Sequence, residues 1–297
     1  MSDNTTQVPW SDEQWARVRQ VIQDEAHRAR VAGSFLPLLG PLPPDTDFVR
    51  ADLMNYGEPG QPNQRMSIDD THTIVLPTLQ VKVWVRGAQM ADPELSSALQ
   101  MFKRAANVLA RLEDAIVFCG QAGKNQGPHD SIDGLPAIWE VLGGQRCRGL
   151  LEIPDDKRVA VPDDKRPGLG EKLVGMVSRA IGDLEARGHF GPFAVALDHR
   201  FFTAVQTPNK TSLVLPQDRI IPFLGGGPLV RSSTLPADSG VVVALGAAPV
   251  ELVVATDVSL NFLQVTTDPM FVFRVFEKIR LRIKEPDAIV ALTPALD

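Results

Sequence analysis

The sequence predicts an α+β fold, with long helices and mainly antiparallel strands in different parts of the chain. Two segments, 92–118 and 169–187, carry apolar residues at steps of three and four, which is typical of helices packed on one side. The last third of the chain consists of short stretches rich in β-branched residues, separated by glycine and proline, which indicates strands and turns. Helices and strands in this order favour an α+β domain.

The first helix is predicted to begin just after Ser11. Ser11 is a suitable N-cap, Gln14 completes a capping box, and Trp10 is placed to pack on Trp15 across the helix start. Apolar residues then follow one side of the helix at Trp15, Val18, Ile22, Ala26 and Ala29. The sequence GSFLPLLGPLPP that follows predicts a rigid, proline-rich connector.

The middle of the chain alternates between regular and irregular segments. Residues 46–65 are polar and rich in Gly, Pro and Asn, which predicts an extended arm or loop. Apolar residues alternate over 79–85 and predict a strand, and the helix over 92–118 is the longest periodic segment. Residues 120–170 contain the pentapeptide PDDKR twice, which we interpret as two similar turns rather than an architectural repeat.

A strand near the C-terminus has one apolar and one cationic face. Phe273, Val275, Ile279, Leu281 and Ile283 alternate with cations, and Glu277 interrupts the apolar series. The cationic side is predicted to meet acidic residues of a neighbouring subunit, to face solvent, or to contact nucleic acid. We favour a subunit interface formed by Arg274, Lys278, Arg280 and Arg282.

Composition narrows the class of protein. A net charge of -6 over 297 residues argues against a general nucleic-acid binder. Cys119 and Cys147 make neither a disulfide framework nor a zinc site. The first residues lack the pattern of a secretory leader, and the longest apolar run is interrupted by Pro249 and Glu251, so we expect a cytoplasmic protein without a membrane partner.

The sequence carries no motif that supports an enzyme. Its five histidines have no ligand spacing, and GLGEK at 168–172 lacks the spacing of a phosphate-binding loop. Trp84 and Tyr56 are the aromatic residues on which a flavin would stack, although isolated aromatic residues usually belong to a core. We therefore predict no catalytic residue, no metal and no cofactor.

Several blocks, taken in order, resemble the encapsulin family of bacterial and archaeal shell proteins. They are SDEQW with FLPLLGPL, VLARLEDAIVFCG, GHFGPFAVALDHRFFTAV, FLGGGPLVRSSTL and the segment from residue 250 to residue 292. Together they cover nearly the whole chain. The resemblance implies a Hong Kong 97-type capsid fold with a long spine helix, an axial domain and an extended loop.

Mapped onto this chain, the resemblance implies five parts. They are an N-terminal helix and connector over 1–45, an arm over 46–70, an extended loop over 71–91, a peripheral domain over 92–172 and 240–297, and an axial domain over 173–239.

The resemblance also implies a function. Encapsulins form icosahedral shells of on the order of sixty copies or more. They enclose cargo such as dye-decolourising peroxidases or ferritin-like proteins, which carry C-terminal targeting peptides. The implied cargo-binding residues are Trp15, Val18, Ile22, Phe35, Leu36, Asp257, Val258 and Leu260. The implied pore candidates are Asn209, Lys210 and Thr211.

Two features qualify this picture. Family members often place a basic residue before the apolar pair that follows the first helix and an acidic residue after it, whereas Ser34 and Pro37 stand there in this chain, so its cargo peptide is expected to differ. The alternative is a prophage-type major capsid protein that packages DNA, which the acidic charge balance and the N-terminal helix disfavour.

Overall fold

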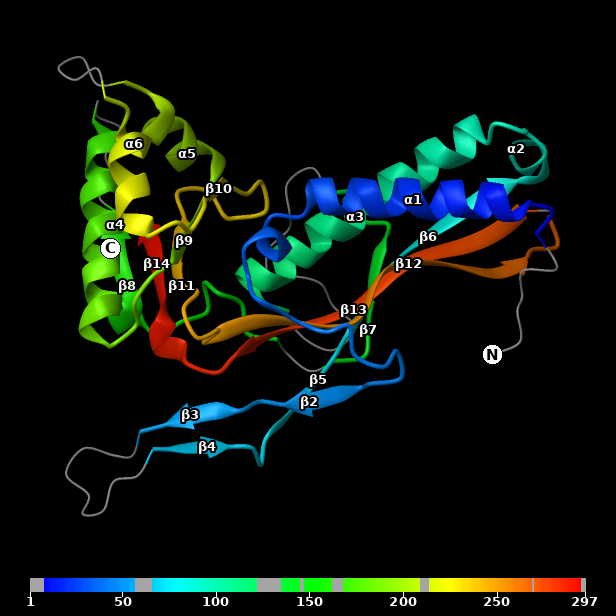
Figure 1. The fold of residues 1–297 in the computed structure, drawn as a ribbon. Coiled ribbons are helices and arrows are strands. Elements are labelled where there is room, and N and C mark those ends of the chain that lie inside the picture. Colours follow the sequence, from blue (N-terminus) through cyan, green and yellow to red (C-terminus); the bar gives the residue numbers. More distant parts are fainter. Residues whose placement is uncertain are drawn as a thin grey trace.

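Two five-stranded sheets organise the chain (Figure 1). The computed structural model describes residues 8–56, 66–121, 135–144, 147–161, 168–208, 214–268 and 270–294. The first sheet, called the elongated sheet, has the strand order β1-β12-β13-β6-β7. Its strands are β1 (Leu38–Leu39), β6 (Thr78–Arg86), β7 (Trp139–Leu142), β12 (Val250–Val265) and β13 (Met270–Ile283). β1 runs parallel to β12, and the other neighbouring strands are antiparallel.

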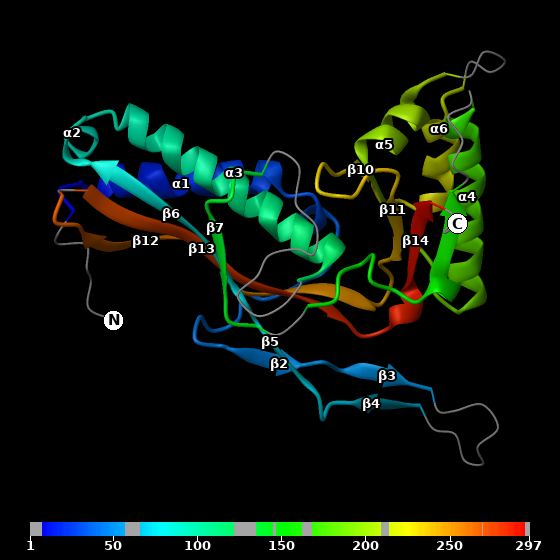
Figure 2. The same ribbon diagram turned by 180° about the vertical axis from the view of Figure 1, so that it is seen from behind.

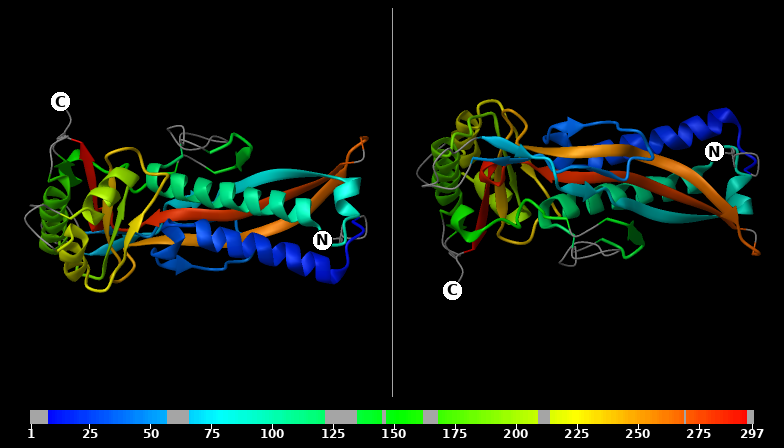
Figure 3. Two further views of the ribbon diagram at one scale, coloured as in Figure 1. Left: turned by 90° about the horizontal axis from the view of Figure 1, so that it is seen from above. Right: turned by 90° about the horizontal axis from the view of Figure 1, so that it is seen from below.

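Two long helices lie side by side over one face of the elongated sheet (Figures 1 and 3). α1 (Asp12–Ala29) begins with the predicted capping box, in which the Ser11 hydroxyl accepts from the Gln14 amide at 3.2 Å and the Gln14 side chain accepts from the Ser11 amide at 3.0 Å. α3 (Ser96–Cys119) is the predicted long helix. It begins at Ser96 rather than Asp92 because the Asp92 carboxylate accepts from the Glu94 and Ser96 amides at its start.

The core between these helices and the sheet is aromatic at one end. Phe273 of β13 is fully buried, stacks on Trp10 at 5.0 Å between ring centroids and meets Phe102 of α3 edge-on at 5.3 Å. Trp10 also meets Trp15 at 5.0 Å, so the predicted contact across the helix start is present. These contacts fix the start of α1 on the sheet. None of the helices in the described parts of the chain is long and apolar enough to span a bilayer.

The second sheet, called the compact sheet, has the order β10-β9-β11-β14-β8. Its strands are β8 (Arg158–Val161), β9 (Phe193–Leu197), β10 (Leu229–Arg231), β11 (Gly240–Ala244) and β14 (Ile289–Pro294). The helices beside it are α4 (Leu169–Ala186), α5 (His199–Gln206) and α6 (Pro216–Ile220). The expected axial segment 173–239 thus shares its sheet with strands on both sides of that range. β9 and β11 are buried at every position, and β14 supplies the hydrogen-bond partner that β11 needs.

A narrow pair of ladders, called the projecting hairpin, lies on the other side of the elongated sheet from α1 and α3 (Figures 1 and 2). β2 (Phe48–Arg50) pairs with β5 (Thr73–Val75), and β3 (Leu53–Asn55) pairs with β4 (Ser67–Asp69). The expected extended loop over 71–91 is not observed as a loop, because residues 78–86 form β6 and residues 87–90 form a helical turn. β6 is a strand of the elongated sheet between β13 and β7, and α3 packs on it. The described residues of the projecting hairpin are the strands within 48–55 and 67–75.

Short helical turns complete the chain. They are η2 (Ala32–Ser34), α2 (Gly87–Met90), η3 (Asp155–Lys157), η4 (Ile221–Leu224) and η5 (Pro286–Ala288). Of these, η2 bears on the site because it turns the chain between α1 and β1.

Replacing Phe273 by alanine is expected to lower the free energy of unfolding by roughly 3–5 kcal/mol, because a fully buried aromatic side chain would leave a cavity between four aromatic neighbours. Chemical denaturation at matched protein concentration measures the loss. Trp84→Ala is the control, since Trp84 lies on the adjacent strand with 48% of its surface exposed. An equal loss in both variants would contradict the prediction.

Candidate functional site

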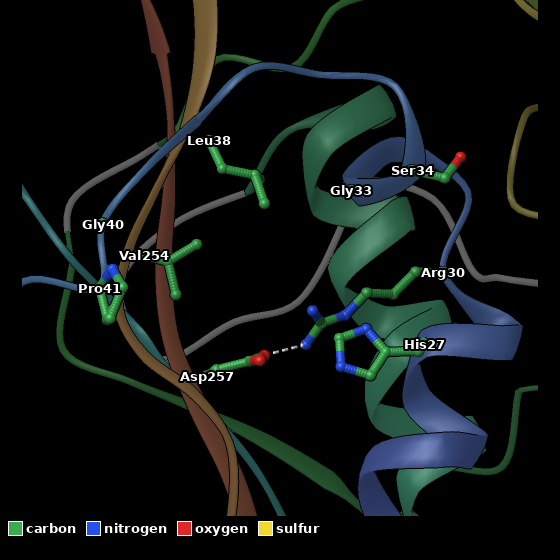
Figure 4. A pocket seen from close by; sticks show the side chains of 9 residues that line it. All are labelled: His27, Arg30, Gly33, Ser34, Leu38, Gly40, Pro41, Val254 and Asp257. Atoms are coloured by element: carbon green, nitrogen blue, oxygen red, sulfur yellow. Dashed lines mark hydrogen bonds and ion pairs between the residues drawn. The ribbon is translucent and has the colours of Figure 1, made fainter.

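The end of α1, the connector after it and β12 enclose a pocket of about 240 Å³ (Figure 4). α1 ends at Ala29, η2 turns the chain, and β1 then runs beside β12 with Leu38 opposite Leu252. The residues that line the pocket are His27, Arg30, Gly33, Ser34, Leu38, Gly40, Pro41, Val254 and Asp257. Leu38 and Val254 give it an apolar wall, and the polar groups of His27, Arg30 and Asp257 gather at one end.

Gly40 allows the connector to lie this close to β12. Its φ of 142° falls in the region that favours glycine, and a Cβ at this position would lie 2.2 Å from the Val254 carbonyl oxygen. The Leu42 amide donates to the same carbonyl at 2.9 Å. The wall of the pocket is therefore set by main-chain contact, and a larger residue at Gly40 would push the connector away from β12.

Arg30 is the central cation of the site. It is mostly buried, and its Nη2 atom lies 2.7 Å from Asp257 Oδ1 and 3.0 Å from Glu277 Oε2, while its Nε atom lies 2.9 Å from Glu113 Oε2. Glu113 comes from α3, Asp257 from β12 and Glu277 from β13. A single guanidinium thus joins the end of α1 to three elements of the body. Burial alone would lower the pKa of Arg30, but the charges of Glu113, Glu277 and Asp257 hold it above its usual value, so Arg30 stays cationic.

The two fully buried carboxyl groups beside Arg30, those of Glu113 and Glu277, both have raised pKa values. Burial raises the pKa of the Glu277 carboxyl well above its usual range, and the negative charge of Glu113 raises it further. Burial also raises the pKa of Glu113, although the charge of Arg30 opposes that effect. Of the two carboxyl groups, Glu277 is the one whose protonated form is favoured more.

Asp114, next to Glu113 in the sequence, holds the turn that follows α1. Its carboxyl oxygens accept from the Val31 amide at 3.0 Å and from the Ala32 amide at 2.7 Å. Burial raises the pKa of Asp114 well above its usual value, and the charge of Glu113 adds to that effect. The adjacent acidic residues of α3 thus have separate tasks, since Glu113 binds Arg30 and Asp114 binds the backbone of η2.

The structure places seven of the eight residues predicted to bind cargo in the core. These are Trp15, Val18, Ile22, Phe35, Leu36, Val258 and Leu260. They seat α1 and its connector on the body. Asp257 is the member of the predicted set that lines the pocket. Leu38 and Val254 also line the pocket, and the sequence did not predict them. They come together because β1 pairs with β12, and no local pattern in the sequence indicates that pairing.

The other predicted site residues lie elsewhere. The pore candidates Asn209, Lys210 and Thr211 fall outside the described residues. Arg274 stacks on the ring of Phe276 at 4.4 Å. Lys278, Arg280 and Arg282 contact Asp47, the Val75 carbonyl and Asp52 of the same chain. Their proposed role at a subunit interface therefore has a competing explanation within the chain.

Comparison with known proteins shows a similarity to encapsulins. A family model described as "Encapsulating protein for peroxidase" matches residues 136–280. The type 1 encapsulin shell protein EncA of Myxococcus xanthus is 27% identical over 299 residues, which covers 97% of this chain and 94% of that protein. The chain is thus similar to encapsulin shell proteins over most of its length. The similarity supports a structural, shell-forming protein rather than an enzyme.

Solved structures show the same fold. A virus-like particle from Pyrococcus furiosus matches this chain with a TM-score of 0.63 at 18% identity, covering 93% of this chain and 98% of that one. The SrpI encapsulin complex from Synechococcus elongatus matches with a TM-score of 0.55 at 11% identity over 88% and 86% of the two chains. The Mycobacterium phage Bobi structure matches with a TM-score of 0.58 at 14% identity over 92% and 91%. The chain thus has the Hong Kong 97-type capsid fold.

Glu277→Gln is expected to flatten the pH dependence of stability. Glu277 has a raised pKa in the fold, so the folded state binds more protons than the unfolded state, and this contribution is lost as pH rises through the folded pKa. Glutamine mimics the protonated acid and cannot lose that proton. The variant and the parent are therefore expected to have similar stability near about pH 5, with the variant more stable near about pH 9.

Thermal unfolding of both proteins across that pH range measures the effect, and Arg30, Glu113, Asp114 and Asp257 remain in place in both. Asp257 acts in the opposite direction, because Arg30 lowers its pKa and its contribution is lost as pH falls. The difference between the two curves of stability against pH therefore reports the contribution of Glu277. Parallel curves would contradict a raised pKa of Glu277 in the folded protein.

Proposed function

We propose that this chain is an encapsulin that closes into a hollow icosahedral shell in the cytoplasm, and that the pocket beside α1 binds the C-terminal peptide of a cargo enzyme. The similarity to encapsulin shell proteins supports the shell, and the family model's description suggests a peroxidase as cargo. A dye-decolourising peroxidase or a ferritin-like protein fits the proposal. The observation that carries the cargo site is the pocket itself, with an apolar wall next to a half-exposed carboxylate.

The chemistry of the pocket suits an apolar peptide with a polar or basic neighbour. Leu38 has 59% of its surface exposed although it belongs to a strand, and it shares the pocket wall with Pro41 and Val254. Covering such a wall stabilises a complex by about 25 cal/mol for each Å² of apolar surface removed from water. Burial alone would raise the pKa of Asp257, but the charge of Arg30 lowers it, so Asp257 remains charged. The Arg30 guanidinium and the Val258 amide both donate to Oδ1, which leaves Oδ2 to accept from a donor on the peptide.

The DNA-packaging alternative receives some support from the likeness to the phage capsid. The cationic face of β13 was the feature that a DNA-binding role would use. Lys278 and Arg282 are paired with carboxylates of the same chain, and the Arg280 guanidinium donates to a main-chain carbonyl. These contacts favour an empty or protein-filled shell over one filled with DNA.

Expression of the chain alone is expected to give uniform hollow particles. Negative-stain imaging measures their diameter and uniformity, and the ultraviolet absorbance ratio measures their nucleic-acid content. Particles filled with DNA would favour the prophage capsid. A monomer or small oligomer would contradict shell closure by this chain alone.

Leu38→Asp is expected to lower cargo uptake at least about tenfold while shells still form, because a carboxylate would replace the apolar wall of the pocket. The probe is a fluorescent protein that ends in the C-terminal segment of a dye-decolourising peroxidase or of a ferritin-like protein. The ratio of fluorescence to shell protein after purification gives the uptake.

Leu142→Asp is the matched control, since Leu142 is also an exposed leucine on an edge strand of the elongated sheet but lies on β7, at the opposite edge from β1. Uptake by this control should equal that of the parent. Equal uptake by Leu38→Asp and the parent would show that the peptide binds elsewhere.

A further inference from the structure

The cationic side of β13 lies against the projecting hairpin of its own chain. Lys278 Nζ lies 2.6 Å from Asp47 Oδ1, just before β2. Arg280 donates to the Val75 carbonyl at 3.3 Å, at the end of β5. Arg282 donates to the Arg50 carbonyl at 3.0 Å and to Asp52 Oδ2 at 2.7 Å.

The contacts continue beyond the end of β13. The Lys284 carbonyl accepts from the Met54 amide at 3.1 Å, and the Glu285 carboxylate accepts from the Tyr56 hydroxyl at 2.5 Å. The contacts between residues 278–285 and residues 47–56 therefore follow the same order along both segments. They join 278 to 47, 282 to 50 and 52, 284 to 54, and 285 to 56. Because every second residue of a strand points to the same side, the period of two in the sequence places the donors Lys278, Arg280 and Arg282 in one line on the side of the hairpin. We call these three residues the cationic track.

Among the residues of the track, Arg282 contacts both the hairpin and β12. Its side chain is mostly buried, and it also donates to Glu251 of β12 at 2.5 Å, directly across the strand pair. Asp52, its partner on the hairpin, has a φ of 50°, a left-handed conformation that aspartate tolerates better than most residues. Asp52 lies between β2 and β3, so the ion pair is made where the first ladder of the hairpin gives way to the second.

Apolar contact at the base of the hairpin is small by comparison. Leu76, Val253 and Ala255 form a separate cluster there, with Leu39, Leu42 and Val49 against it. The hairpin also exposes large apolar side chains, namely Phe48, Tyr56, Met66 and Ile68. In a shell-forming protein, a second copy of the chain is the partner that would cover them.

We propose that the cationic track sets the direction of the projecting hairpin and thereby the geometry in which copies of this chain associate. The inference rests on the proposed closed shell. Asp47 and Asp52 are positioning residues: they orient the apolar surface of the hairpin for a neighbouring copy. A hairpin released from the track meets the next copy at variable angles, and closure into one particle size fails.

The test replaces the acidic residues on the hairpin side, in the double variant Asp47→Lys with Asp52→Asn. Arg282 keeps Glu251 in this variant, so the body retains its buried ion pair. The fraction of protein in shells of the parent diameter, measured by negative-stain imaging and sedimentation, is expected to fall at least about tenfold. Unassembled subunits with the parent's melting temperature and particles of mixed diameter both support the proposal.

Two further variants separate positioning from a general loss of charge or of folding. Asp70→Asn is the matched control, because Asp70 pairs with Arg50 on the exposed surface of the hairpin itself, away from the track. It should assemble like the parent. Adding Lys278→Asp to Asp47→Lys reverses the outer pair and should restore most of the assembly that Asp47→Lys alone loses. Failure of this rescue, or an equal defect in Asp70→Asn, would overturn the proposal.

Hydrogen exchange gives a readout that is independent of shell closure. The amides of residues 48–55 are expected to exchange at least about tenfold faster in the double variant than in the parent, because the hairpin would leave β13. If the parent forms no shell, the proposed function fails while this measurement still tests the track. Unchanged exchange together with uniform shells of the parent size would overturn the track as the positioning device.

Discussion

The buried contact between Arg30 and three carboxyl groups is the constraint on which the rest of the site depends. Arg30 is the C-cap of α1, directly after Ala29, so its position decides where the connector leaves the helix. Removing one partner of such a buried cluster costs about 3–5 kcal/mol, because it leaves charge without compensation. With Arg30 fixed and Asp114 holding the next turn, β1 is brought beside β12 and the pocket forms between them.

Side chains of β13 make ion pairs on both faces of the elongated sheet, because successive residues of a strand point to opposite faces. Glu277 lies on the side of β13 that faces the helices, where it meets Arg30 and Glu113, whereas Lys278 and Arg282 face the hairpin. The acidic residue that interrupts the apolar series in the sequence is thus the anchor for α1. The cations between the apolar residues have partners in the chain because the hairpin brings carboxylates to them.

Local signals in the sequence predicted the local structure. The capping box at Ser11, the long helix ending at Cys119 and the alternation over β6 and β13 all follow from side chains a few positions apart. The site depends on pairs that are distant in sequence, such as Arg30 with Glu277, and no local pattern names such partners. The hairpin strands contain only three residues each, too few for alternation to distinguish them from a loop.

The pocket and the hairpin depend on different ion pairs of the same two strands. Asp257 of β12 belongs to the Arg30 cluster beneath α1, and Glu251, six residues earlier on β12, belongs to the Arg282 cluster beneath the hairpin. Side chains distant along a strand and on opposite faces of a sheet couple weakly when they share no partner. The proposed cargo pocket and the proposed positioning of the hairpin are therefore separable, since a change in the pocket leaves the track in place, and a change in the track leaves α1 packed on the elongated sheet.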